Sequence, residues 1–93
     1  PMAAMAGAVS GLYAIRVPAH PKTTYSASVV SGGTSVNSIP DRVAVEIDMR
    51  SSNPAALASL EAGMLAAAEA AVAAENAARS TRSGRVALAK EVI

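Results

Sequence analysis

The sequence predicts an α+β fold, a ferredoxin-like two-layer sandwich with helices on one face of an antiparallel sheet. Two segments show helical spacing of apolar residues, and three show strand-like alternation. The helical segments are 2–16 and 54–78, and the strand segments are 23–31, 42–50 and 85–93. Their order, α-β-β-α-β, matches the split unit β-α-β-β-α-β without its first strand. We therefore expect residues 1–93 to be a single domain that is truncated at its N-terminus.

The composition predicts a light hydrophobic core. Of the 93 residues 23 are Ala and two are Tyr, and the chain contains no Phe or Trp. Alanine buries little area, so the apolar fraction of 52% overstates the hydrophobic driving force. A domain of this size is already short of core, and we expect it to gain stability from a partner.

The first helix, 2–16, is predicted from its apolar spacing and from Pro18, which disfavours helical geometry in the residue before it. Gly7 and Gly11 lie four residues apart and share one helix face. Glycine costs an isolated helix about 1 kcal/mol, a cost that is tolerated where two backbones approach closely. Two contacts would use this face: packing on the domain's own sheet, or a helix–helix contact across a dimer.

Strand 42–50 has the clearest alternation, with apolar residues on one face and Arg50 on the polar face at the strand's exit. Strand 23–31 has a more polar second face, which is typical of an exposed or edge strand. Its expected faces are Tyr25, Ala27 and Val29 on one side, and Ser26, Ser28 and Val30 on the other.

The second helix, 54–78, is expected to be capped by Ser52 or Asn53, with Pro54 in the first helical position. Its expected apolar face consists of Leu57, Leu60, Met64, Ala68 and Ala71. A polar turn, 79–84, then leads into the last expected strand.

Several function classes have little support. The net charge is +1 and the basic residues are scattered, which argues against nucleic-acid binding. His20 is the one histidine and there is no cysteine, so no Ser-His-Asp set can be argued, and a catalytic zinc site would need several carboxylates to join this histidine. His20 lies in a Pro-rich loop, where we expect it to be solvated and without function. We expect no phosphate loop, no membrane span, no signal peptide and a cytoplasmic location.

Four residues offer chemistry. Glu46 and Asp48 share one strand face and are either a carboxylate pair or part of a solvated polar surface. Asn37 lies in a Gly-rich connection and offers donors and an acceptor, although Asn in loops often bonds local groups. Arg50 offers a bidentate fork for a carboxylate, although it could instead pair with an acidic residue on the sheet.

A resemblance to a known family bears on these positions. The two strings that carry it are Gly32-Gly33-Thr34-Ser35-Val36-Asn37-Ser38-Ile39-Pro40 and Asp48-Met49-Arg50-Ser51. The chain resembles the dimerisation (lid) domain of the two-zinc metallopeptidases and amidohydrolases that include aminoacylase, glutamate carboxypeptidase, acetylornithine deacetylase and succinyl-diaminopimelate desuccinylase.

The resemblance implies a parent exopeptidase or amidohydrolase that hydrolyses amide bonds of peptides or N-acyl amino acids. Two zinc or similar divalent ions would lie in a catalytic domain absent from this chain, so the chain alone would be inactive. The lid would form a homodimer through strand 23–31 and helix 2–16, and it would close over substrate. Asn37 and Arg50 would bind substrate, and Asn37 could reach across the dimer. The loop that supports this site would include Gly32, Gly33 and Thr34.

The chain departs from the family in one respect. Relatives carry a His just before the first lid helix that reaches the active site, and His20 is not its equivalent. Two other classes stay open: a regulatory module that binds a small ligand such as an amino acid, and a purely structural interaction domain.

Overall fold

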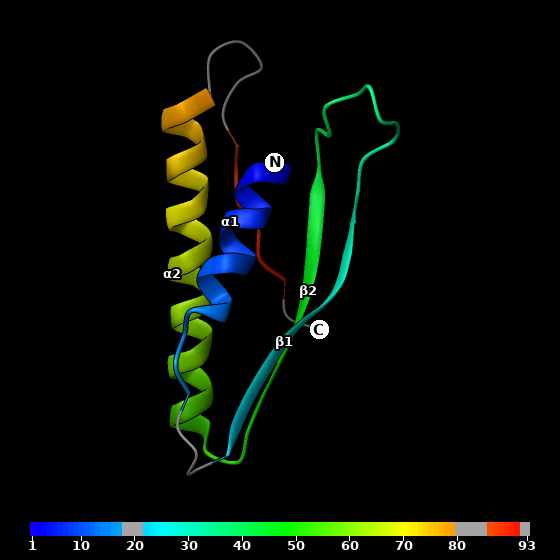
Figure 1. Ribbon diagram of the computed structural model, residues 1–93. Helices are drawn as coiled ribbons and strands as arrows, with labels where there is room; N and C mark the ends of the chain where they lie inside the picture. Colours follow the sequence, from blue (N-terminus) through cyan, green and yellow to red (C-terminus); the bar gives the residue numbers. More distant parts are fainter. Residues whose placement is uncertain (18–21, 80–85, 92–93) are drawn as a thin grey trace.

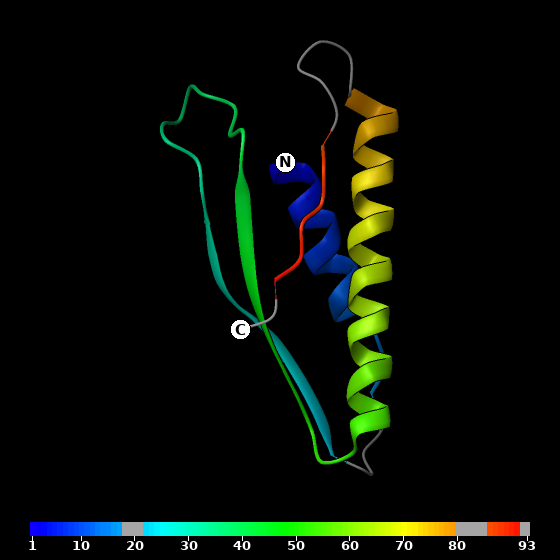
Figure 2. The same ribbon diagram turned by 180° about the vertical axis from the view of Figure 1, so that it is seen from behind.

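The computed structural model describes residues 1–17, 22–79 and 86–91. Its elements, in chain order, are α1 (Met2–Tyr13), β1 (Thr23–Gly32), β2 (Val43–Ser51) and α2 (Pro54–Arg79). In the described residues β1 and β2 form a two-stranded antiparallel sheet, and both helices lie on the same side of it (Figures 1 and 2). The predicted α+β class, with helices on one face of an antiparallel sheet, is confirmed.

The two helices pack through their smallest residues. A Cβ atom built on Gly11 would lie 2.9 Å from the Cβ of Ala67, and one built on Gly7 would lie 3.2 Å from the Cβ of Ala71. These separations are shorter than ordinary van der Waals contact, so glycine lets α1 approach α2 closely. Both expectations for the glycine face were therefore wrong, because it packs neither on the sheet nor on a partner but on the second helix of the same chain.

The core between the layers is as light as the composition predicts. The buried hydrophobic residues are Ala4, Leu12, Leu60 and Ala68, of which Leu12 alone is completely inaccessible in the described residues. The expected apolar face of α2 is confirmed, since Leu57, Met64 and Ala71 are half-buried along the same stripe. Asn53 caps α2 by accepting hydrogen bonds from the backbone N–H groups of Ala55 (2.8 Å) and Ala56 (3.2 Å).

Helix α1 ends at Tyr13, three residues earlier than predicted. The backbone N–H of Ala14 donates to the carbonyl of Gly11 (3.2 Å), and that of Ile15 donates to Leu12 (3.0 Å). Such bonds between residues three apart tighten and end a helix. The chain thus leaves helical geometry before Pro18, which lies outside the described residues together with His20.

A bulge in β1 changes the predicted faces of that strand. Pairing runs from Ala27 opposite Ile47 directly to Val29 opposite Glu46, which leaves Ser28 as the extra residue. One extra residue reverses the alternation beyond it. Val30 therefore shares the helix side of the sheet with Val45, while Val29 lies on the outer side with Glu46. The sequence predicted the reverse, with Val29 on the face of Tyr25 and Ala27 and Val30 on the other face.

Two tyrosines join the helical layer to the hairpin. The rings of Tyr13 and Tyr25 lie 5.5 Å apart between centroids. The Tyr25 hydroxyl donates to the carbonyl of Ile15 (2.8 Å), and the backbone N–H of Ala27 donates to the Tyr13 hydroxyl (2.9 Å). The end of α1 is thereby fixed to the middle of β1.

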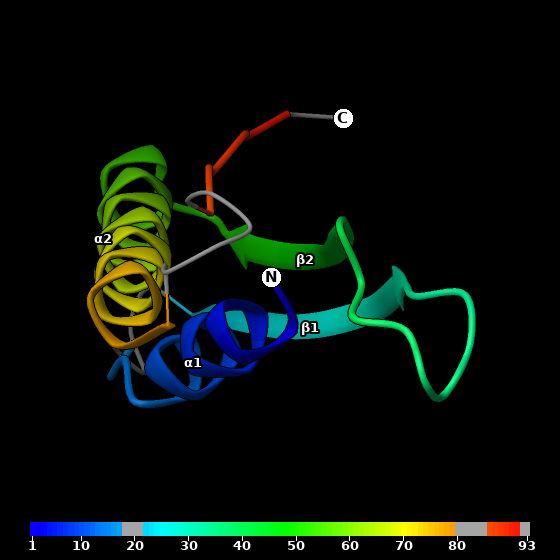
Figure 3. The same cartoon turned by 90° about the horizontal axis from the view of Figure 1, so that it is seen from above.

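The last predicted strand, 85–93, is not present in its described part. Residues 86–91 form no strand and are held on α2 instead. The Asn76 carboxamide both donates to the carbonyl of Val86 (3.0 Å) and accepts from its N–H (2.6 Å), and Lys90 pairs with Glu61. Figure 3 shows this segment on the side of β2 that faces away from β1. A strand needs a neighbouring strand to form hydrogen bonds with its backbone N–H and C=O groups. Within the described residues, no strand lies between β2 and 86–91 to form these bonds.

Helix α2 also meets the length and composition expected of a membrane span. An 18-residue window within Pro54–Ala78 reaches a mean hydropathy of 1.4, although no span was predicted here. Alanine supplies most of this hydropathy, and Leu60 and Ala68 are buried within the domain. Composition alone therefore gives weak grounds for a membrane span.

The expected polar turn begins one residue late, because Arg79 still belongs to α2. The remainder of the expected turn, 80–84, lies outside the described residues.

Replacing Gly11 with Val should destabilise the domain by about 1–3 kcal/mol, because the added side chain overfills the contact with Ala67. Urea unfolding followed by circular dichroism measures the change. Ala6→Val, at an exposed position of the same helix, is the matched control and should cost no more than about 0.7 kcal/mol. Equal losses in the two variants would contradict the close contact between the helices.

Candidate functional site

The connection between β1 and β2 leaves the sheet at Gly32, where the two chain segments lie very close together; we call this point the neck. Its φ of +138° is a conformation that side chains disfavour. A Cβ atom there would also lie 2.7 Å from the carbonyl oxygen of Arg42 and 2.8 Å from the Cα of Val43. Gly33 follows with a φ of +90°. These two glycines let the chain turn out of the hairpin while the strands stay paired up to Gly32.

Asn37 lies at the tip of this loop, in a β-turn from Ser35 to Ser38. The backbone N–H of Ser38 donates to the carbonyl of Ser35 (3.3 Å), and the Ser35 hydroxyl donates to Asn37 Oδ1 (2.8 Å). That oxygen is held locally, while the carboxamide N–H groups donate to no described residue. Val36 and Ile39 are almost fully exposed beside it, so the tip packs on nothing in the described chain.

Arg50 lies near the other end of the hairpin, on the outer face of β2. Its Nε donates to Asp48 Oδ2 at 2.9 Å, and its side chain is 78% exposed. The expected pairing of Arg50 with an acidic residue on the sheet is thus observed. Asp48 therefore pairs with Arg50, and Glu46 remains on the solvated polar face.

The two predicted binding residues are far apart within one chain. Arg50 is opposite Thr24 near the start of β1, whereas Asn37 lies beyond the Gly32–Val43 pair at the opposite end. Val43 and Arg50 are seven positions apart on β2, or about 23 Å at strand spacing. One chain therefore cannot bring Asn37 and Arg50 to the same small ligand.

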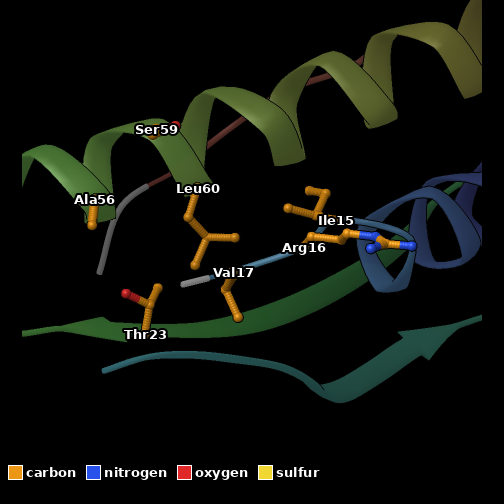
Figure 4. A pocket seen from close by; sticks show the side chains of 7 residues that line it. All are labelled: Ile15, Arg16, Val17, Thr23, Ala56, Ser59 and Leu60. Atoms are coloured by element: carbon orange, nitrogen blue, oxygen red, sulfur yellow. The ribbon is translucent and has the colours of Figure 1, made fainter. Parts of the chain in front are cut away.

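An apolar pocket lies between the first turns of α2 and the start of the sheet. It encloses about 160 Å³ and is lined by Ile15, Arg16, Val17, Thr23, Ala56, Ser59 and Leu60. Figure 4 shows Leu60 pointing from α2 toward Val17 and Thr23, while Arg16 extends away from them. Its lining lacks any group that could act as a general acid or base, so it is a packing space rather than a catalytic site.

A second, more open depression of about 410 Å³ surrounds Arg50. Its lining adds Lys22, Thr24, Ser51 and Ser52. Lys22 was not singled out from the sequence, because it lies in the turn directly before β1, where strand alternation does not fix the direction of a side chain. The lining residues include two cations and three hydroxyl side chains, which can bind an anion.

A metal centre does not fit the described residues. Within 1–17, 22–79 and 86–91 no three His, Asp or Glu side chains gather closely enough to hold an ion. Catalytic zinc ordinarily needs three protein ligands. The hairpin accordingly offers binding groups, namely an amide tip and a basic end, rather than a centre for bond cleavage.

A family model of the peptidase dimerisation domain matches residues 1–76, which span α1, β1, β2 and most of α2. The chain belongs to the peptidase dimerisation domain family. Among curated proteins, no relative matches it. The match covers both helices and the hairpin but ends before residues 86–91.

Membership gives this dimerisation domain a role in self-association within a family of hydrolases. It also accounts for the absence of a catalytic centre from the described residues, since a dimerisation domain need not perform the hydrolysis. The resemblance found in the two sequence strings is thereby confirmed at the level of the family.

Gly32→Ala should destabilise the hairpin by about 1–3 kcal/mol, because alanine is strained at this φ and its Cβ would meet the opposite strand. Thermal unfolding measures the loss, and backbone NMR shifts of residues 33–42 report the accompanying change in the loop. Ser31→Ala, at the exposed neighbouring position, should leave both unchanged. A Gly32 variant with native stability would show that the neck is not a constraint.

Proposed function

We propose that this chain is the dimerising, substrate-covering lid of a zinc-dependent exopeptidase or amidohydrolase. The parent enzyme would hydrolyse amide bonds of peptides or N-acyl amino acids, with its two metal ions held in a separate catalytic domain. The observation that carries the proposal is the outer edge of β1 beside α1, which pairs with no other strand of the described residues, in a chain of the peptidase dimerisation domain family. At Ala27 the backbone N–H of this strand already donates to the Tyr13 hydroxyl of α1. An exposed edge can pair with a second copy of itself.

The composition of β1 supports this edge as the interface. Val29 and Val30 lie on opposite faces of the strand and are 49% and 57% exposed. Tyr13 extends from α1 to the backbone N–H of Ala27, so the helix and the strand are held together along one surface. A twofold contact uses the same patch on both copies, and a strand beside a helix can form such a patch.

A dimer of this kind would also explain the separation of Asn37 from Arg50. When two β1 edges pair antiparallel, the loop of one copy extends past the first residues of the partner's β1. The partner's Arg50 lies on the adjacent strand near that end, opposite Thr24. Asn37 of one copy and Arg50 of the other would then face one substrate, and Val36 and Ile39 would gain a surface to pack on.

The role of the lid in catalysis would be to bind, orient and enclose the substrate. Enclosure excludes water, and orientation brings the scissile bond to the metal-bearing domain. Asn37 would donate its free amide hydrogens, and Arg50 would contribute its two Nη groups. The loop residues Gly32, Gly33 and Thr34 would set the position of Asn37. No proton transfer would be assigned to any residue of this chain.

Val29→Lys/Val30→Lys should convert the dimer into a monomer, because lysines on an edge strand oppose pairing with a like edge. Light scattering after size exclusion measures the mass of the chain. Ala58→Lys/Ala62→Lys adds the same charge on the exposed face of α2 and should leave the dimer intact. A wild-type chain that remains monomeric, or an edge variant that still dimerises, would refute the β1 interface.

Mixing two variants of the full-length parent that bind substrate poorly tests the shared site. Asn37→Ala and Arg50→Met should each raise KM strongly when alone. A mixed dimer would keep one intact site out of two, because the intact Asn37 and Arg50 come from different chains. Equal random mixing should therefore restore about a quarter of the wild-type sites.

Steady-state kinetics of the mixture, after unfolding and refolding together, gives the result. If both residues acted within one chain, each site of the mixed dimer would retain a defect and activity would not recover. An Arg50→Met parent with unchanged KM would remove Arg50 from the substrate site altogether. Each variant refolded alone is the control.

A further inference from the structure

The basic end of the hairpin contains a second cation, Lys22, which lies outside the two sequence strings that carry the family resemblance. Lys22 lines the 410 Å³ depression together with Thr24, Arg50, Ser51 and Ser52. The side chain of Lys22 forms no ion pair with any described residue. It precedes Thr24 by two positions, and Thr24 is opposite Arg50 across the sheet. Lys22 is the turn residue directly before β1, and the shared lining of the depression places it near Arg50 at this end of the hairpin.

Arg50 is already oriented before any ligand arrives. Asp48 accepts a hydrogen bond from Nε, the inner nitrogen of the guanidinium group, and so leaves the two outer Nη groups for a ligand. The two residues are two positions apart on one strand face, which is the geometry that lets this contact form. An arginine whose plane is fixed in this way loses less conformational entropy when it binds a carboxylate.

The charges at this end are suited to one negative charge. Lys22 and Arg50 are cationic, and Asp48 compensates one of them, so one positive charge remains uncompensated. Hydroxyl groups of Thr24 and Ser52 line the same depression and can donate hydrogen bonds to an anion. The backbone at the start of α2 does not compete for this role, because Asn53 already accepts from the N–H groups of Ala55 and Ala56.

The lower wall of the depression is held by its own hydrogen bonds. The Ser51 hydroxyl lies 3.0 Å from that of Thr23 and accepts from the backbone N–H of Asn53 (3.2 Å). Thr23 is itself buried. The end of the hairpin and the start of α2 therefore form one connected frame beneath the two cations.

We infer that Lys22 and Arg50 together bind a single carboxylate in this depression, with Asp48 as the residue that positions Arg50. The ligand class is a monoanion such as the carboxylate of an N-acyl amino acid or of a peptide C-terminus. This inference rests on the proposed function for its substrate, and it adds Lys22 as a specificity-determining residue. A substrate that ends in a neutral amide would lose both charged contacts.

A titration of the ¹⁵N-labelled chain with N-acetylglycine tests the inference, with N-acetylglycinamide as the neutral probe. The carboxylate should give saturable NMR shifts at Thr24, Ser51, Ser52 and the Arg50 Nε–H, and the amide should give none. Lys22→Met should weaken binding roughly threefold to fivefold, in the range of an exposed charge contact. Lys22→Arg should restore it.

Two further variants separate the roles. Arg42→Met removes one positive charge at the opposite end of the hairpin and should leave the affinity unchanged. Asp48→Asn should weaken binding and also broaden the Arg50 Nε–H signal in the free chain, a change that a simple loss of charge would not produce. Native amide spectra for every variant confirm that the fold is retained.

The outcomes distinguish this inference from the function on which it rests. Equal losses in Lys22→Met and Arg42→Met would overturn the inference by showing general charge attraction. Saturable binding of inorganic phosphate without binding of N-acetylglycine would also overturn it. If Arg50→Met weakens binding while Lys22→Met does not, the inference fails and the proposed function stands. If the chain never dimerises yet Lys22→Met weakens binding selectively, the carboxylate site stands and the dimerising function fails.

Discussion

The close contact between the two helices is the constraint on which the rest of this structure depends. The chain lacks Phe and Trp, and the buried hydrophobic residues that the structure describes are two leucines and two alanines. With so little side-chain volume, the helices gain contact by approaching closely at Gly7 and Gly11. Close packing lets many weak dispersion contacts replace a few large ones. Once α1 is fixed on α2, Tyr13 and Ile15 hold β1 from the end of that helix.

The hairpin that these contacts hold carries all of the candidate binding groups of the domain, divided between its two ends. Asn37 lies on a projecting turn, whereas Arg50 lies near the start of α2 with Lys22 beside it. Within one chain, this division keeps Asn37 and Arg50 too far apart to bind one small ligand. When two hairpins pair antiparallel, Asn37 of one copy would lie near Arg50 of the other. Dimerisation would therefore also form the substrate site. The strand edge that joins two copies would bring the Asn37 loop of one copy to the Arg50 end of the other.

The alternation of residues predicted both strands of the hairpin to within one residue at each end, because one half-buried face imposes a period of two. It did not predict the bulge at Ser28, since serine and valine at 28–30 suit either register and the partner strand decides which residue is left over. Nor did alternation predict the fate of residues 86–91. Their pattern is that of a strand, but a strand forms only against another edge, and here Asn76 and Glu61 hold the segment on α2.

The sequence by itself determined the class of fold, a cap of α2 at Ser52 or Asn53, and the family to which the chain belongs. It did so because periodicity, capping and the Gly-Gly-Thr and Asp-Met-Arg strings are local properties. The tertiary structure decided what the glycines of α1 contact, which face Val29 and Val30 occupy, and that Asn37 and Arg50 lie at opposite ends of one hairpin. It also revealed Lys22 beside Arg50. These features depend on contacts between residues that are distant in the sequence, and local residue spacing does not predict such contacts.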